Sequence, residues 1–151
     1  MRKPVIAGNW KLYKTKDEAL ALIEELAPLV AGVDSVEVVV APVFTVLPTL
    51  PAALAGTSIS LAAQDVFWEE EGAFTGEVSP RMLLDAGASH VIIGHSERRQ
   101  YFGETDATVN KKIKAALKGA LVPIFCIGET LDAREAGDTF KVLERQVQGG
   151  L

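Results

Sequence analysis

A histidine, a glutamate and two arginines stand together in the stretch Gly94-His95-Ser96-Glu97-Arg98-Arg99. Residues 90–93, just before it, are apolar enough to form a buried strand. The imidazole of a histidine titrates near neutral pH, and the polar groups that follow His95 can fix the tautomer of its ring. The stretch therefore predicts one part of an active-site rim, centred on His95.

A second polar cluster, Gly8-Asn9-Trp10-Lys11, follows the apolar residues 5–7 in the same way. In parallel α/β proteins, functional groups collect where strands end and the following loops begin. The ammonium group of Lys11, beside Asn9, is a candidate donor to an oxyanion or a phosphate. An ordinary solvated lysine is the alternative that remains open.

Several other reactive residues have simpler interpretations. His90 stands at the opposite end of the strand from His95, and a lone histidine is more often structural than catalytic. Glu97, Glu129 and the Arg98-Arg99 pair are expected to form salt bridges at strand ends. Cys126, within an apolar segment, is expected to be a small buried side chain.

Composition excludes some classes of protein. The 151 residues are 48% hydrophobic and 23% charged, as in ordinary globular domains, and the net charge of −5 argues against a nucleic-acid binder. A single cysteine cannot form an intramolecular disulfide, and no metal-ligand spacing surrounds it. No signal peptide or membrane span is recognisable. We therefore expect a cytoplasmic protein without a metal site.

Short apolar runs alternate with helical patterns along the whole chain, which predicts five βα units in one domain, residues 1–151. Predicted strands cover residues 5–7, 36–41, 59–63, 90–93 and 122–127. Helix signals include a Thr15–Glu18 capping box before an apolar stripe of Leu22, Leu26 and Leu29 with Ile23 and Val30, and starts at Ser79-Pro80 and Thr105-Asp106. Two helical pieces follow the fifth strand, and in the second Phe140, Leu143 and Val147 share one face.

Strict alternation of this kind implies a parallel sheet with right-handed crossovers. Either a barrel or a doubly wound sheet could be built from it. Neither GxGxxG nor GxxxxGK[ST] occurs in the sequence, so the usual nucleotide-binding evidence for a doubly wound sheet is missing.

One connection, residues 64–78, is too long for a plain turn. It carries Val66, Phe67, Trp68 and Phe74 among four acidic residues. Aromatic side chains are poorly placed in water, so we interpret this loop as a surface for a partner. The alternative is that the aromatic side chains fold back onto their own domain.

Five motifs in one consistent order closely resemble the triosephosphate isomerase family. They are Gly8-Asn9-Trp10-Lys11, Ala63-Gln64-Asp65, Gly76-Glu77-Val78-Ser79, Ile93-Gly94-His95-Ser96-Glu97-Arg98-Arg99 and Cys126-Ile127-Gly128-Glu129-Thr130. Each motif alone is weak evidence, but five in order are specific. The resemblance runs from about Lys3 to the last residue and is to bacterial members.

The resemblance implies a (β/α)8 barrel that interconverts dihydroxyacetone phosphate and glyceraldehyde 3-phosphate without a cofactor, as a step of glycolysis and gluconeogenesis. By the same resemblance, Asn9 and Lys11 bind the substrate, and the ammonium of Lys11 stabilises its negative charge. His95 is the electrophile, a neutral imidazole, and Ser96 and Glu97 support the site. Thr75, with Phe74 and Trp68, belongs to the loop that family members insert into a neighbouring subunit.

A barrel of this type has eight strands in roughly 250 residues, whereas this chain has five predicted strands and ends at Leu151. The family's catalytic glutamate, its mobile lid and its phosphate-binding loops belong to later units. We therefore expect a fragment that is inactive alone, with open sheet edges at the first and fifth strands and unpartnered inward faces at residues 36–41 and 124–125. Self-association into a homo-oligomer would cover the open side.

Two alternatives stay open at this point. The chain could act only as a self-assembling folding module, without catalysis of its own. Less favoured is a doubly wound domain that binds a phosphorylated metabolite, since this would leave the five ordered motifs unexplained.

Overall fold

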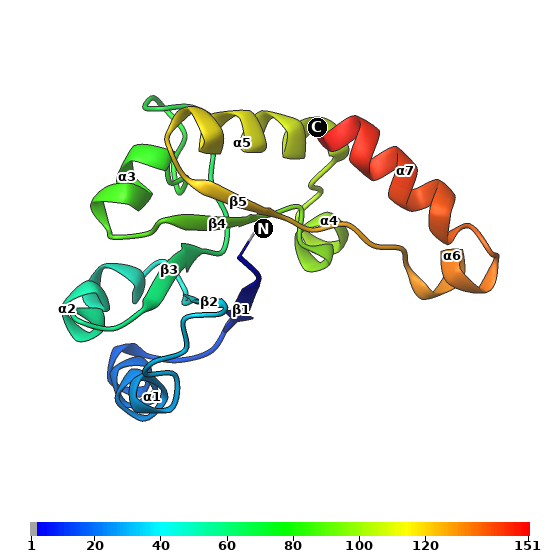
Figure 1. Ribbon diagram of the computed structural model, residues 1–151. Helices are drawn as coiled ribbons and strands as arrows, with labels where there is room; N and C mark the ends of the chain where they lie inside the picture. The colour runs from blue at the N-terminus through cyan, green and yellow to red at the C-terminus, as the bar shows by residue number, and fades with distance from the viewer. Residues whose placement is uncertain (1–2) are drawn as a thin grey trace.

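The computed structural model describes residues 3–151, so Met1 and Arg2 of the predicted domain lie outside the described residues. Five strands form a single curved sheet (Figure 1). The strands are β1 (Val5–Asn9), β2 (Glu37–Ala41), β3 (Ile59–Ala63), β4 (His90–Ile93) and β5 (Val122–Phe125). The helices are α1 (Lys16–Leu29), the 3-10 turn η1 (Leu47–Thr49), α2 (Pro51–Leu54), α3 (Pro80–Asp85), α4 (Ser96–Tyr101), α5 (Asp106–Lys118), α6 (Leu131–Glu135) and α7 (Thr139–Gly150).

The strand order decides between the two predicted architectures. Every strand pairs in parallel with its neighbours in sequence, so the order is β1-β2-β3-β4-β5. A doubly wound sheet reverses its order at a switch point, and this sheet does not. The described residues therefore form five successive units of a β/α barrel wall, with β1 and β5 as open edges, and the prediction of a partial barrel is confirmed.

The convex face of the sheet carries the main core. Alternate strand residues point toward the helices, and Val40, Leu61, Val91 and Ile93 are buried there beneath α1, α2 and α5. These strands are nearly continuous runs of apolar residues because the other face is covered as well.

The predicted stripe of α1 was partly wrong. The helix begins as expected, with the Glu18 carboxylate accepting from the Thr15 N–H at 2.7 Å. Of the predicted stripe, Ile23 is buried and Leu26 and Val30 pack against the core, whereas Leu29 is exposed. The face that packs on the sheet also runs through Ala19, which the prediction did not include.

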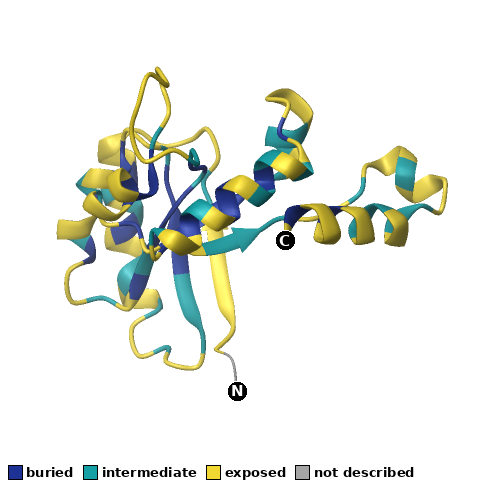
Figure 2. Cartoon of the chain, turned by 90° about the horizontal axis from the view of Figure 1, so that it is seen from above, coloured by how far each residue is buried: buried dark blue, intermediate teal, exposed yellow. Residues whose placement is uncertain are grey.

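The concave face is more fully packed than expected. Val39, Ala41, Ala62 and Ile92 form a buried cluster, with Ile124 and Cys126 against it. The expectation that residues 36–41 would lack partners on their inward face was wrong, because the curl of the sheet brings β2, β3 and β4 side chains together. Strand β1, at the edge, does remain open, and Ile6 is 62% exposed (Figure 2).

The last two helices extend beyond β5 as an arm whose surface is mostly exposed (Figure 2). Of the predicted apolar face of α7, Leu143 is partly buried, whereas Phe140 is 84% exposed and Val147 is also exposed. Gln146 is buried instead, and its amide exchanges two hydrogen bonds with the backbone of Gly128, at 2.8 and 3.0 Å. The arm is therefore attached by these polar contacts and by packing of α7 against α5 and of Gly150 against Phe125, and Phe140 stays uncovered within the described part of the chain.

The sequence prediction missed α4 altogether. This helix has six residues, SERRQY, too few for any apolar periodicity. It begins directly after His95, which acts as its N-cap residue. The predicted fifth strand was also too long, since β5 ends at Phe125 and the chain leaves the sheet after the Cys126 N–H has bonded to the Ile93 carbonyl at 2.8 Å.

The structure supports part of each interpretation of loop 64–78, a surface for a partner or side chains that fold back onto their own domain. Val66 is buried in the core. Phe67 stacks on Trp68 and on Phe74, with ring centroids 4.1 and 4.8 Å apart. Phe74 nonetheless remains 44% exposed, so part of this aromatic cluster faces outward. Among the described helices, none is long and apolar enough to cross a membrane.

Candidate active site

The two polar clusters found in the sequence meet at the carboxyl ends of β1 and β4. Lys11 lies just beyond β1, and His95 lies just beyond β4. Glu97 connects them: its Oε1 is 2.8 Å from the Nζ of Lys11. Its backbone N–H donates to the Nδ1 of His95 at 3.3 Å. The fold thus brings a cation, an imidazole and a carboxylate to one point on the rim.

The backbone of Lys11 is held on both sides. Its φ angle of 53° lies in the left-handed region, which is unfavourable for a residue other than glycine. The Oδ1 of Asn9 accepts from the Lys11 N–H at 2.9 Å, and the Nε2 of Gln64 donates to the Lys11 carbonyl at 2.9 Å. Backbone strain of this kind persists where the surroundings fix it, and such positions cluster at functional sites.

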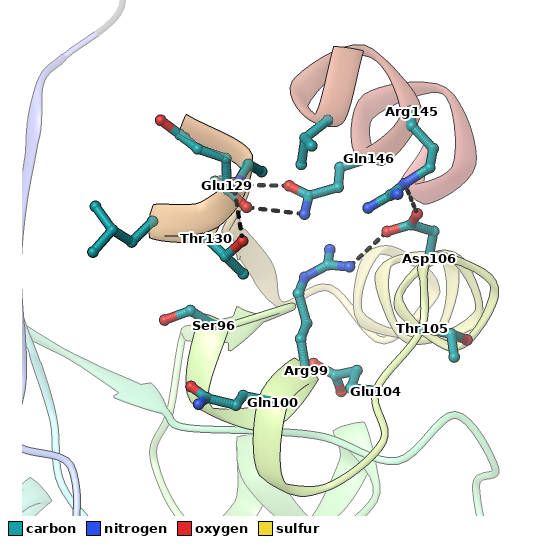
Figure 3. Close-up of a pocket in the computed structure, with 14 residues that line it drawn as sticks. Ser96, Arg99, Gln100, Glu104, Thr105, Asp106, Glu129, Thr130, Arg145 and Gln146 are labelled. Carbon is teal, nitrogen blue, oxygen red and sulfur yellow. Dashed lines mark hydrogen bonds and ion pairs between the residues drawn. The ribbon is translucent and has the colours of Figure 1, made fainter. Parts of the chain in front are cut away.

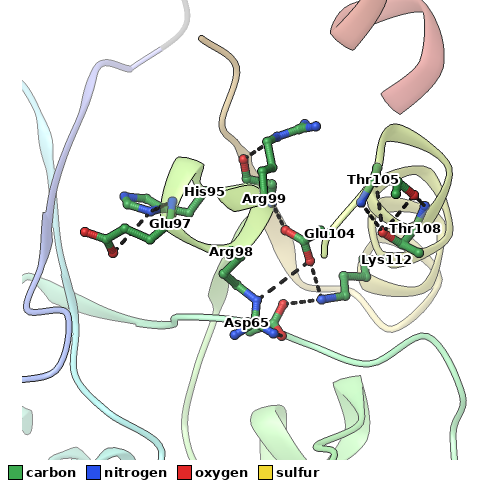
Figure 4. A network of polar contacts seen from close by, with 10 residues as sticks. Asp65, His95, Glu97, Arg98, Arg99, Glu104, Thr105, Thr108 and Lys112 are labelled. Carbon is green, nitrogen blue, oxygen red and sulfur yellow. Dashed lines mark hydrogen bonds and ion pairs between the residues drawn. The ribbon is translucent and has the colours of Figure 1, made fainter. Parts of the chain in front are cut away.

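The ring of His95 has a defined tautomer. The backbone N–H of Glu97 donates to its Nδ1 at 3.3 Å, so this nitrogen carries no proton (Figure 4). In a neutral imidazole the proton then sits on Nε2. Only 22% of the side chain is exposed. His95 is therefore arranged to offer an Nε2–H donor.

The charges of Lys11 and Glu97 support each other. The hydrogen bond from Lys11 lowers the pKa of Glu97, and the same bond, with the negative charge of Glu97, raises the pKa of Lys11. Lys11 is therefore a full cation throughout the neutral range. Glu97 is bound to it and is poorly suited to act as a separate base.

Behind the rim lies a buried ionic network that the sequence analysis did not find. The Nζ of Lys112 is 2.6 Å from Asp65 Oδ1 and also bonds to Glu104 Oε1 (Figure 4). Arg98 lies 2.8 Å from the other oxygen of Asp65. Burial raises the pKa of Asp65, although the charges of Lys112 and Arg98 oppose that shift. The network ties α5, α4 and the start of loop 64–78 together.

Other residues highlighted by the sequence lie away from this point. Ser96 lines a cavity of about 770 Å³ on the side of α4 that faces α7, together with Arg99, Asp106 and Gln146 (Figure 3). Glu129 also lines this cavity, with Oε1 3.2 Å from the hydroxyl of Thr139.

The residues with simpler interpretations behave mostly as expected. His90 is buried, and its Nδ1 is 2.9 Å from the hydroxyl of Ser89. The salt bridges predicted for Glu97, Arg98, Arg99 and Glu129 are present. Cys126 is half-buried rather than buried, and its partial burial raises the pKa of its thiol.

The three residues expected at an interface lie on loop 64–78. Trp68 rests against α5, with Lys111 Nζ 5.1 Å from the ring centroid. Phe74 and Thr75 are both exposed.

In chemical terms, the rim offers hydrogen-bond donors and positive charge. The Lys11 ammonium and the Nε2–H of His95 are suited to stabilise negative charge that develops on the oxygens of a small substrate. The arrangement fits a reaction that passes through an oxyanion.

Comparisons with known proteins agree with this geometry. The family model described as triosephosphate isomerase matches residues 4–151. Triosephosphate isomerase of Citrifermentans bemidjiense is 92% identical over all 151 residues, and that of Geotalea uraniireducens is 70% identical over the same length. The chain spans 60% of the length of each of these curated relatives.

A solved structure shows the same likeness. The crystal structure of triosephosphate isomerase from Bartonella henselae matches with a TM-score of 0.94 and 39% sequence identity. The match covers 99% of this chain and 62% of that one.

Proposed function

Because the chain belongs to the triosephosphate isomerase family, we propose that the rim formed by Lys11, Glu97 and His95 is the electrophilic half of an isomerase site, the part that stabilises negative charge on the substrate oxygens. In a protein of the relatives' full length, it would act in the interconversion of dihydroxyacetone phosphate and glyceraldehyde 3-phosphate. No cofactor is needed, because the reaction moves a proton between adjacent carbons.

The residues have separate roles in this proposal. Lys11 places a permanent positive charge beside the substrate, and Asn9 holds the loop that carries it. The Nε2–H of His95 donates to the oxygens of the enediolate as they gain charge. Glu97 supports both, and Ser96 follows His95 as the first residue of α4.

The single observation that carries the proposal is that Glu97 contacts both groups: its carboxylate binds the Lys11 ammonium, and its backbone N–H donates to the Nδ1 of His95. It holds a cation and an imidazole donor at one point of the rim, although Lys11 follows β1 and His95 follows β4. We assign none of these residues as the base that removes the substrate proton. Glu97 does not take this role, because its carboxylate is bound to Lys11.

The direct experiment joins residues 1–151 to the remainder of the Citrifermentans bemidjiense relative and measures isomerase activity in a coupled assay. Activity in the joined protein, its loss in Lys11→Met and its retention in the exposed control Lys16→Met would support the proposal. A folded but inactive joined protein would contradict it. A polypeptide of residues 1–151 alone is expected to show no turnover above buffer.

We further propose that loop 64–78 contacts a second copy of the chain. The outward-facing Phe74, its neighbour Thr75 and the stacked Trp68 support this, since exposed aromatic clusters mark association surfaces. We also propose that the protein is located in the cytoplasm.

A further inference from the structure

The peptide groups of Gly94, directly before His95, are held by two charged side chains. The Gly94 N–H donates to Glu104 Oε2 at 3.0 Å. The Gly94 carbonyl accepts from Arg99 Nε at 2.8 Å. We name this pair of contacts, Glu104 and Arg99 on Gly94, the Gly94 clamp.

Each arm of the clamp is itself anchored. Glu104 is 8% exposed, and its other oxygen bonds to the buried Lys112. The Nη1 of Arg99 is 2.5 Å from Asp106 Oδ1 at the start of α5. Hydrogen bonds in which one partner is charged are about twice as strong as neutral ones, so both contacts are strong restraints.

The clamp acts on a backbone with little other freedom. Gly94 has a φ angle of 78°, and a Cβ atom there would meet Arg99 Nη2 and the Cys126 carbonyl at 3.0 Å each. The turn at Gly94 sets the direction in which the chain leaves β4. The next residue is His95, so the turn sets where the backbone that carries the imidazole begins.

We propose that Glu104 and Arg99 are positioning residues for His95, acting through Gly94. Neither contacts the imidazole itself, and each fixes one side of the peptide that aims it. The role rests on the proposed function of His95, but the position of the ring can be measured without any activity.

The chain offers an internal comparison, because it contains only two histidines. His90 lies at the other end of the same strand, away from the clamp. In a proton–carbon NMR spectrum of the 151-residue chain, the two imidazoles therefore give one affected signal and one internal reference.

The first variant is Glu104→Gln. A glutamine amide presents one oxygen and one NH2 group, so it cannot replace a carboxylate that accepts from both Gly94 and Lys112 through separate oxygens. We expect the Gly94 amide signal and the His95 ring signal to move by more than their line widths, with the His90 signal unchanged. Glu70→Gln, which removes a carboxylate from the exposed pair with Lys118, is the matched control and should move neither ring signal.

A His95 signal that stays fixed while the Gly94 amide moves would overturn the proposal. If Glu104→Gln unfolds the chain, both ring signals collapse, and Arg99→Lys then tests the clamp from the carbonyl side. A lysine has one ammonium in place of the guanidinium fork that reaches both Gly94 and Asp106, so His95 should move there as well.

An unmoved His95 in Arg99→Lys would overturn the positioning role. Unfolding of both variants would overturn it too, because the clamp would then hold the fold rather than aim one ring. Inactivity of the joined protein would leave the NMR result untouched and would count against the proposed function alone.

Discussion

The Nζ of Lys11 and the Oε1 of Glu97 lie 2.8 Å apart, although one follows β1 and the other belongs to α4. This contact joins the two ends of the rim across the sheet. It also places the only carboxylate bonded to Lys11 among the described residues on the helix that begins after His95. The charge state of Lys11 is therefore tied to the position of α4.

The first prediction concerns this charge. Because Glu97 raises the pKa of Lys11, the ammonium should titrate above the ordinary value of 10.5, and Glu97→Gln should bring the pKa back down toward it. A raised pKa favours the charged form, so the contact is complete at neutral pH and is lost as the pH rises through the pKa of Lys11. At the acid end it is lost as the pH falls through the lowered pKa of Glu97. Carbon NMR of the lysine Cε signals measures this.

The exposed pair of Glu70 and Lys118 is the control for that titration. Glu70 raises the pKa of Lys118 in the same way, so Glu70→Gln should lower the pKa of Lys118 and leave Lys11 unchanged. A Lys11 signal that titrates identically with and without Glu97 would show that the contact is absent in solution.

The second prediction concerns the buried network. Lys112→Met would leave the carboxylates of Asp65 and Glu104 buried without their shared cation, and breaking a buried ion pair costs about 3–5 kcal/mol. Urea unfolding followed by circular dichroism measures the loss. Lys118→Met, at the exposed pair, should leave the midpoint unchanged, and equal midpoints for the two variants would contradict the network's importance.

The third prediction concerns the turn at Gly94. Gly94→Ala places a Cβ atom in the left-handed region and against the Cys126 carbonyl, which should destabilise the fold by about 1–3 kcal/mol. Gly128→Ala is the matched control, because a Cβ atom there meets nothing within 4 Å. The same urea measurement compares them, and a Gly94→Ala variant as stable as the control would refute the strain argument.

The fourth prediction concerns association. With β1 open and Ile6 exposed, a 151-residue polypeptide should form a homo-oligomer, measured by light scattering. Ile6→Lys places a charge on that edge and should lower the mass. A compact monomer of 16.1 kDa for the unmodified chain would rule out self-association.

Much of the fold was predictable because its signals are local. The strands are apolar runs, and α3 and α5 begin after Ser79 and Thr105, whose side chains accept hydrogen bonds from their first turns. The family resemblance rested on short motifs at the ends of these strands. Those motifs contain the residues that fix the backbone of Lys11 and that form the turn before His95. They are specific for this reason.

The rest depends on contacts between distant residues. Lys112 and Asp65 are 47 positions apart, and neither lies in a pattern that marks it as buried. The six residues of α4 are too few to show a helical periodicity. In α7 the buried side chain is that of Gln146 rather than that of Phe140. Such features follow from tertiary packing, which no local pattern records.

The most direct test of the proposed site is the kcat of the joined protein with His95→Gln. Glutamine keeps a donor but not the geometry of the imidazole, and loss of one preorganised donor to an oxyanion lowers kcat by roughly 10²–10³-fold. We predict a fall of this order, with Lys16→Met unaffected. An unchanged kcat in a folded His95→Gln protein would contradict the assignment of these residues to the electrophilic half of the site.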